Sequence, residues 1–128
     1  MQATFRIDHV MLPVEDIDRS IAFYSSLLGM RVLESRSDAK RRIAHVGYGP
    51  RGEQATLELV QTLAAASPPS AGGGHFCLCV HGLASLCGQV EKSGGSFDRP
   101  LDAAGGAVRR AWIRDPDGHL IELSESGV

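Results

Sequence analysis

The chain has 128 residues, with 13 basic and 15 acidic side chains and a formal net charge of -2; this length corresponds to about one domain, which can bury a core without disulfides or a structural metal. The balanced charge excludes the basic surface that nucleic acids and anionic membranes attract, and the sequence has neither a membrane-spanning apolar stretch nor a signal-peptide pattern. Three cysteines without a C-x-x-C pair indicate free thiols in a reducing compartment, so we expect a cytoplasmic protein with no nucleic-acid and no membrane partner.

The first half of the chain predicts a strand, a helix and three more strands. The strand is expected at residues 5–14, and the helix after it has Asp16 or Asp18 as its N-cap and Gly29 just past its end. The apolar residues that recur at helical spacing are Ile17, Ile21, Tyr24 and Leu28. Apolar or alternating runs bounded by polar and Gly/Pro turns predict the three further strands at 31–36, 42–49 and 55–62.

The same order of elements returns after a connector. Residues 64–74, AAASPPSAGGG, are too rich in small residues and proline to pack, and they join two halves. The second half predicts a strand at 75–80, a helix at 82–95 and extended segments at 96–100, 107–115 and 119–125. We therefore predict an α+β protein of two βαβββ modules, residues 1–63 and 75–128, which form a curved mixed sheet in a single domain spanning residues 1–128.

Each half carries a histidine on its first strand and a glutamate on its last. Glu58 follows His9 at nearly the same spacing as Glu122 follows His75. Whatever places His9 beside Glu58 in the first module should therefore place His75 beside Glu122 in the second.

These four residue types suit a metal site. Because side chains alternate along a strand, Glu58 lies on the opposite face from Leu57 and Leu59. A carboxylate on the concave face of a sheet must be paired, protonated or bound to a cation. Two imidazoles and two carboxylates would supply two nitrogen and two oxygen ligands to one divalent metal, with room for water.

The sequence resembles the vicinal oxygen chelate superfamily, and within it glyoxalase I. The resemblance rests on IDHVMLPVEDIDRSIAFYSSLLGMRVL, HVGYGPRGEQATLELV and RDPDGHLIELSE, which together cover most of the chain. It implies metal ligands at His9, Glu58, His75 and Glu122, with Ni²⁺ or Zn²⁺ as the foremost metals and Co²⁺, Mn²⁺ or Fe²⁺ as others. It also implies a homodimer in which a site can draw ligands from both chains.

The reaction that the resemblance implies is a proton transfer. The metal binds two adjacent oxygens of a small carbonyl compound or its thiol adduct and stabilises an enediolate, while Glu122 or Glu58 moves a proton between neighbouring carbons. The chain departs from the family at Pro13 and Thr62, where glyoxalase I typically has an arginine and an asparagine that contact glutathione. We therefore expect a lactoylglutathione lyase-like metalloenzyme with weak activity on the glutathione adduct.

Two other kinds of site would need fewer ligands. The metal site of a ring-cleaving dioxygenase or a thiol transferase needs only three ligands, which here would be His9, His75 and Glu122. Glu58 would then have no role. A metal-free binding protein of the bleomycin-resistance type would not need all four residues.

The remaining chemically active side chains are expected to have other roles. We expect His45, His81 and His119 to be structural or solvated, and Cys77 and Cys79 to be strand residues on the face of His75. Arg109 or Arg110 could hold a substrate carboxylate, although a solvated arginine is equally consistent with the sequence.

Overall fold

In the computed structural model, the described residues are 2–64, 67–99 and 108–126. The chain packs as two compact units, Met1–Ser70 and Ala71–Val128. The boundary between them falls inside the expected connector, of which residues 65–66 lie outside the described residues.

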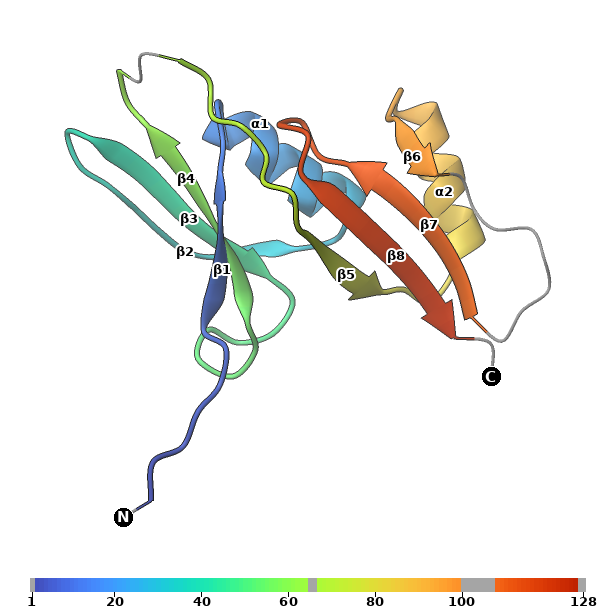
Figure 1. Cartoon of the computed structure of the whole chain (residues 1–128), viewed down its shortest axis with the longest axis horizontal. Helices are drawn as coiled ribbons and strands as arrows, with labels where there is room; N and C mark the ends of the chain where they lie inside the picture. Colours follow the sequence, from blue (N-terminus) through green and yellow to red (C-terminus); the bar gives the residue numbers. More distant parts are fainter. Residues whose placement is uncertain (1, 65–66, 100–107, 127–128) are drawn as a thin grey trace. The chain divides into compact units, whose positions relative to one another are not determined.

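The first unit is a four-stranded mixed sheet with one helical segment (Figure 1). The strand order is β1-β4-β3-β2, in which β1 runs parallel to β4 and the other neighbours are antiparallel. Its elements are β1 (His9–Pro13), α1 (Ile17–Ala22), η1 (Phe23–Leu27), β2 (Arg31–Ser37), β3 (Arg41–Gly47) and β4 (Thr56–Thr62).

The second unit repeats this arrangement. The strand order is β5-β8-β7-β6, again with a parallel first pair and antiparallel neighbours after it. Its elements are β5 (His75–Cys79), α2 (Leu83–Lys92), β6 (Phe97–Arg99), β7 (Val108–Arg114) and β8 (Leu120–Ser126). The prediction of an α+β fold with two βαβββ modules is confirmed.

Several elements differ from the prediction in their bounds or in their type, among them β1, the first helix and β6. β1 begins at His9 because its partner β4 begins at the residue opposite, Thr56, so the residues before His9 have no neighbouring strand. The first helix continues after Ala22 as the π-helix η1. In the second unit β6 covers only residues 97–99, while the predicted residues 100 and 107 lie outside the described part of the chain.

The helix start also resolves an open alternative. Asp16, and not Asp18, is the N-cap, because its carboxylate accepts hydrogen bonds from the backbone N–H groups of Asp18 and Arg19 at 3.1 and 3.2 Å. Gly29 follows the helical segment with φ +71°, a conformation that glycine adopts without the steric cost of a Cβ atom.

The two faces of each sheet have different roles. Leu57 and Leu59 of β4 are buried on one face, whereas Glu58 lies on the other and is partly exposed. In β8, Ile121 and Leu123 are fully buried and flank the partly exposed Glu122 in the same way. The alternation therefore presents one glutamate per unit on the face away from the apolar core.

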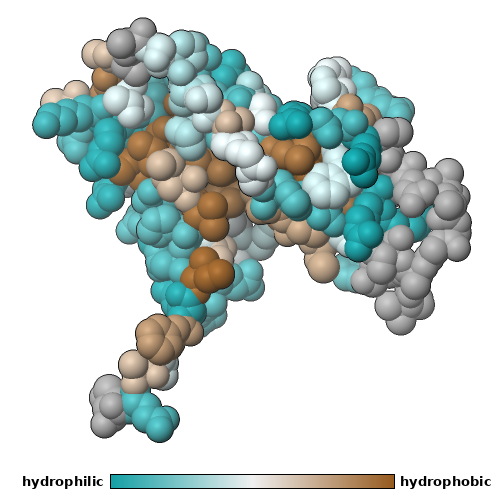
Figure 2. Space-filling view, in the orientation of Figure 1, coloured by the Kyte–Doolittle hydropathy of each residue, from teal (hydrophilic) through white to brown (hydrophobic). Residues whose placement is uncertain are grey.

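Apolar side chains remain exposed near the N-terminus, and they are Phe5, Ile7, Val10 and Met11. Figure 2 shows hydrophobic colour along the N-terminal segment at the lower left of the view. No helix in the described part of the chain is both long and apolar enough to cross a membrane.

Candidate metal centre

In the first unit the parallel pairing of β1 and β4 brings His9 close to Glu58. His9 lies opposite Thr56 in the register, two residues before Glu58 and on the same face of the sheet. The His9 Nε2 atom lies 3.7 Å from Glu58 Oε2. The expected neighbourhood of this histidine and glutamate is therefore present.

The second unit repeats the same offset. His75 lies opposite Leu120, two residues before Glu122. The His75 Nε2 atom lies 3.3 Å from Glu122 Oε1. Both units thus place a histidine of the first strand diagonally across from a glutamate of the last.

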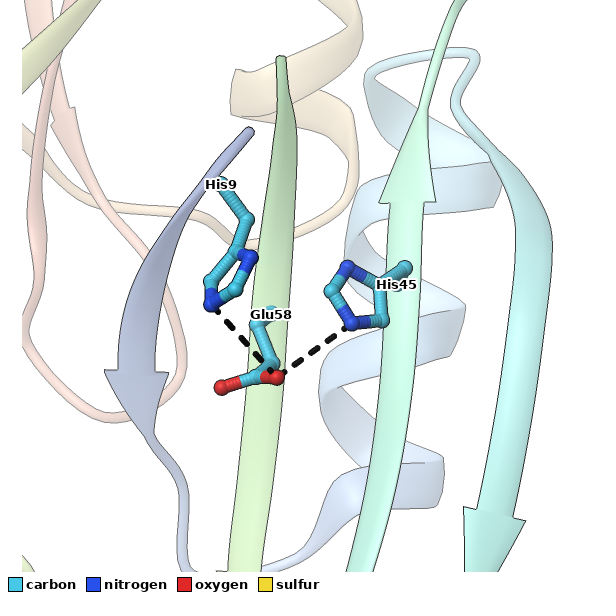
Figure 3. A group of neighbouring side chains, drawn as sticks. All are labelled: His9, His45 and Glu58. Atoms are coloured by element: carbon cyan, nitrogen blue, oxygen red, sulfur yellow. Dashed lines mark ion pairs between the residues drawn. The ribbon is translucent and has the colours of Figure 1, made fainter. Parts of the chain in front are cut away.

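A third residue joins the first pair. His45 of β3 lies directly opposite Glu58 in the antiparallel register, and its Nε2 atom is 3.3 Å from Glu58 Oε2. Figure 3 shows His9 and His45 pointing toward Glu58 from the strands on either side. One ligand atom from each of the three residues lies within 4.8 Å of the others.

His45, which we expected to be structural or solvated, is buried beside the candidate site. The side chain is only 5% exposed, and its Nδ1 atom lies 2.7 Å from the Thr56 hydroxyl oxygen. Burial lowers the pKa of His45, and the nearby Arg51 lowers it further. These effects favour the neutral imidazole, which is the form that binds metals. Of the other two histidines, His81 is exposed and His119 is buried.

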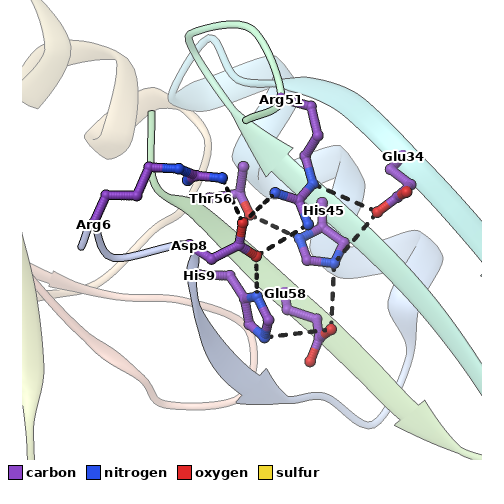
Figure 4. Close-up of polar contacts among 8 residues, drawn as sticks. All are labelled: Arg6, Asp8, His9, Glu34, His45, Arg51, Thr56 and Glu58. Atoms are coloured by element: carbon purple, nitrogen blue, oxygen red, sulfur yellow. Dashed lines mark hydrogen bonds and ion pairs between the residues drawn. The ribbon is translucent and has the colours of Figure 1, made fainter. Parts of the chain in front are cut away.

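Charged residues of the segment before β1 and of the loop between β3 and β4 form a network of hydrogen bonds with this cluster (Figure 4). His9 Nδ1 lies 2.6 Å from Asp8 Oδ2. Arg51 donates two hydrogen bonds to the Asp8 carboxylate, at 2.9 and 3.1 Å, and Arg6 donates another at 2.9 Å. The hydrogen bonds from Arg51 and then from His9 hold the pKa of Asp8 far below its ordinary value. The ionised carboxylate can only accept, so His9 donates through Nδ1 and its Nε2 faces Glu58.

The glutamate of the second unit has a different environment. Arg110 Nε lies 3.0 Å from Glu122 Oε2. Trp112, the residue directly opposite Glu122, packs edge-on against His75 with the ring centres 4.8 Å apart. Cys77 lies beside Glu122 in the register, and burial raises the pKa of its thiol.

The second arginine of the predicted pair lies beside another glutamate. Arg109 Nη1 lies 3.6 Å from Glu125 Oε1, whereas Arg110 contacts Glu122. Of the two arginines, Arg110 is therefore the one beside a candidate site residue.

Comparison with known proteins assigns the family. A family model described as the Glyoxalase/Bleomycin resistance protein/Dioxygenase superfamily matches residues 6–123. The chain belongs to this superfamily. It is 38% identical to the lactoylglutathione lyase of Salmonella typhimurium over 125 residues, 94% of this chain and 93% of the relative. It is 37% identical to the lactoylglutathione lyase of Escherichia coli O157:H7 over 124 residues, 94% of this chain and 92% of the relative.

A solved structure agrees with these relatives. The trypanothione-dependent glyoxalase I of Leishmania major matches with a TM-score of 0.84 and 31% identity, over 95% of this chain and 87% of that one. Within the glyoxalase superfamily, the chain is therefore a lactoylglutathione lyase-like enzyme.

The donor atoms present fit the divalent metal implied by the resemblance to glyoxalase I. His9, His45 and Glu58 offer two imidazole nitrogens and a carboxylate, and His75 and Glu122 offer one of each. Imidazole suits zinc, nickel and iron, and carboxylate ligands accept all three. The Nδ1 atom of His9 donates to a carboxylate, which is the usual support for a histidine that binds metal through its other nitrogen.

A cavity of about 650 Å³ lies toward the other ends of β1 and β4, and its lining includes Pro13, Val60 and Thr62. Pro13 is four residues beyond His9 on the same face of the sheet, roughly 13 Å along the strand. Pro13 and Thr62, the two positions at which we expect a departure from glyoxalase I, therefore line one cavity in the first unit.

Proposed function

We propose that the chain is a metal-dependent lyase or isomerase of the glyoxalase I type, acting on a small carbonyl compound or its thiol adduct. His9, Glu58, His75 and Glu122 would hold the metal. The observation that supports this proposal is the histidine–glutamate pair, which recurs at the same register offset in both units. A carboxylate kept on the polar face of each sheet beside an imidazole is suited to hold a cation.

When bound, the metal supplies a Lewis acid that stabilises the enediolate form of the substrate. The chain's own residues would move the proton. Glu122 and Glu58 are the candidate bases, with side chains only 16% and 14% exposed. Arg110 and His75 contact opposite oxygens of Glu122 and orient its carboxylate, which as the base would take a proton from one carbon and return it to the next.

Several properties of the enzyme belong to the same proposal. The metal would be Ni²⁺ or Zn²⁺, because both accept imidazole and carboxylate ligands, with Co²⁺, Mn²⁺ or Fe²⁺ as substitutes. The two units would form one domain, and the working form would be a cytoplasmic homodimer.

The thiol partner of the substrate is a separate question. The cavity lining at Pro13 and Thr62 offers neither a cationic side chain nor a carboxamide at these positions, so we expect poor recognition of glutathione. The Leishmania major relative is described as trypanothione-dependent. Thiols other than glutathione therefore belong in the substrate panel.

The test uses the metal-reconstituted chain with the methylglyoxal hemithioacetals of several thiols. Thioester formation with at least one of them, lost after chelation and restored by Ni²⁺ or Zn²⁺, is the expected result. Each of His9→Ala, Glu58→Ala, His75→Ala and Glu122→Ala should weaken metal binding, whereas His119→Ala should not. A chain that binds no divalent metal after reconstitution would instead be a metal-free binding protein.

A further inference from the structure

We propose that His45 is a metal ligand, which with His9 and Glu58 forms a three-ligand site for a divalent transition-metal ion inside the first unit. The inference rests on the proposed metal-dependent function and adds a residue to the four ligands given above. The first unit would then retain the ion without His75 and Glu122.

The three ligand atoms lie within 4.8 Å of one another, close to the separations found around one ion. Bonds of about 2.0–2.1 Å to a metal separate neighbouring ligand atoms by roughly 3 Å in octahedral and roughly 3.3 Å in tetrahedral coordination. Glu58 Oε2 lies 3.3 Å from His45 Nε2 and 3.7 Å from His9 Nε2. The His9 distance is longer than these values, so binding of an ion would require a small shift of the His9 ring, whose side chain is 36% exposed.

Both imidazoles present the same nitrogen to the glutamate. His9 uses Nδ1 to donate to Asp8, and His45 uses Nδ1 in its contact with the Thr56 hydroxyl. With the hydrogen on Nδ1, the Nε2 lone pair of each ring faces a carboxylate that is itself an acceptor. A divalent cation between these three acceptors would be bound by all of them.

The second unit serves as an internal comparison. The position opposite its glutamate is Trp112, whose indole offers a donor but no lone pair for a metal. Arg110 also places a positive charge 3.0 Å from Glu122, which opposes a nearby cation. The arginine near the first cluster, Arg51, is instead paired with the carboxylates of Asp8 and Glu34. The two units are therefore unequal, and the first one has the stronger set of metal ligands.

The competing explanation gives His45 a positioning role. The Thr56 hydroxyl would donate to Nδ1, and the Nε2–H group would hold Glu58 in place without contacting a metal. The two explanations predict different results when the second pair of ligands is removed.

The experiment measures Co²⁺ and Zn²⁺ binding to full-length variants by equilibrium dialysis, with Co²⁺ visible absorption as a second readout. In the His75→Ala/Glu122→Ala variant we expect about one bound Co²⁺ per chain, at reduced affinity. Adding His45→Phe to that variant should abolish the binding, and His45→Phe alone should weaken binding by more than the roughly 10- to 100-fold that loss of a supporting residue costs. His119→Gln, which replaces another buried histidine, is the matched control.

A direct readout guards against indirect effects of the substitution on folding. In the wild-type chain, Zn²⁺ should change the ¹⁵N chemical shift of His45 Nε2 as strongly as that of His9 Nε2. Circular dichroism checks each variant, and His45→Gln replaces His45→Phe if the latter does not fold.

The outcomes separate this inference from the proposed function. If wild type binds Co²⁺ but the His75→Ala/Glu122→Ala variant binds none, or if the His45 Nε2 signal does not respond to Zn²⁺, His45 is not a ligand and the four-ligand function stands. A wild-type chain that binds no metal overturns both proposals.

Discussion

Asp8 fixes the orientation of a proposed ligand, and this role can be tested by a single substitution. The carboxylate accepts from His9 Nδ1 and is itself held by Arg51 and Arg6. We predict that Asp8→Ala lowers Co²⁺ or Zn²⁺ affinity by about 10- to 100-fold, because the imidazole loses the partner that fixes its tautomer and ring orientation. Equilibrium dialysis measures the change.

The matched control for this substitution is Asp98→Ala. Asp98 is also a half-exposed carboxylate paired with an arginine, Arg114, at 2.9 Å, but it contacts no proposed ligand. Its loss should leave metal affinity unchanged. Equal losses in both variants would mean that Asp8 acts through net charge alone.

Pro13 and Thr62 determine, in our account, how well the enzyme handles a glutathione adduct. We predict that Pro13→Arg with Thr62→Asn raises kcat/KM for the methylglyoxal–glutathione hemithioacetal. Charge-assisted contacts contribute about 1.5–3 kcal/mol each, or roughly one to two orders of magnitude per contact. Steady-state kinetics measures the gain.

The control for this pair is Pro13→Ala, which removes the proline without adding a cation and should bring no gain. A wild-type kcat/KM already near that of an efficient enzyme, about 10⁵ M⁻¹s⁻¹ or more, would mean that other residues bind glutathione.

At the scale of elements, a carboxylate of β8 takes the place of an N-cap for α2. Gly82 precedes the helix and has no side chain, so Glu125 accepts hydrogen bonds from the N–H groups of Gly82 and Leu83, at 2.6 and 3.0 Å. These hydrogen bonds lower the pKa of Glu125. The ionised carboxylate therefore links the start of α2 to the sheet of the same unit.

We predict that Glu125→Gln lowers the free energy of unfolding at neutral pH and has a smaller effect in acid. A carboxyl group with a lowered folded-state pKa stabilises the fold above its unfolded pKa, about 4.3, and this contribution is lost as the pH falls through the folded-state value. Urea unfolding of both proteins at pH 7 and about pH 3 measures the difference. An equal difference at both pH values would contradict the electrostatic explanation.

The order of elements was predictable because the pattern occurs twice. Each half shows a short apolar strand, an amphipathic helix and three extended runs, and the structure has that order in both units. The sequence did not predict the π-helix η1 or the late start of β1. A π-helix has one extra residue in a helical turn, and no residue pattern in this segment indicates it. The start of β1 depends on where its partner strand β4 begins.

The position of His45 was also predictable in principle, because it follows from the register of one hairpin. The expected turn GPRGEQ spans residues 49–54, and a hairpin symmetric about its centre pairs His45 with Glu58, as the structure does. The periodicity of a single strand predicts which face of the sheet a side chain lies on, but it does not predict which residue lies opposite on the neighbouring strand. The partners Asp8 and Arg51 could not be found this way, because they meet through a loop and an irregular segment.

At the scale of the whole molecule, the two edges of the first sheet are unequal. The β2 edge carries charged residues such as Arg31, Glu34 and Arg36, which discourage pairing with another chain. The β1 edge and the segment before it instead expose Phe5, Ile7, Val10 and Met11, at 93%, 70%, 47% and 52%. An exposed apolar strand edge of this kind is usually covered, and a second copy of the chain is the commonest partner.

We predict that the chain is a twofold homodimer that uses the β1 edge. Sedimentation velocity at micromolar concentration should find a dimer for wild type and a monomer for Ile7→Lys/Val10→Lys, because two ammonium groups would have to be desolvated in the interface. Val32→Lys is the matched control, since Val32 is 45% exposed on the opposite edge and its change should leave the dimer intact. A monomeric wild-type chain would reject the homodimer. Dissociation caused by Val32→Lys, with the Ile7→Lys/Val10→Lys variant still dimeric, would move the interface to β2.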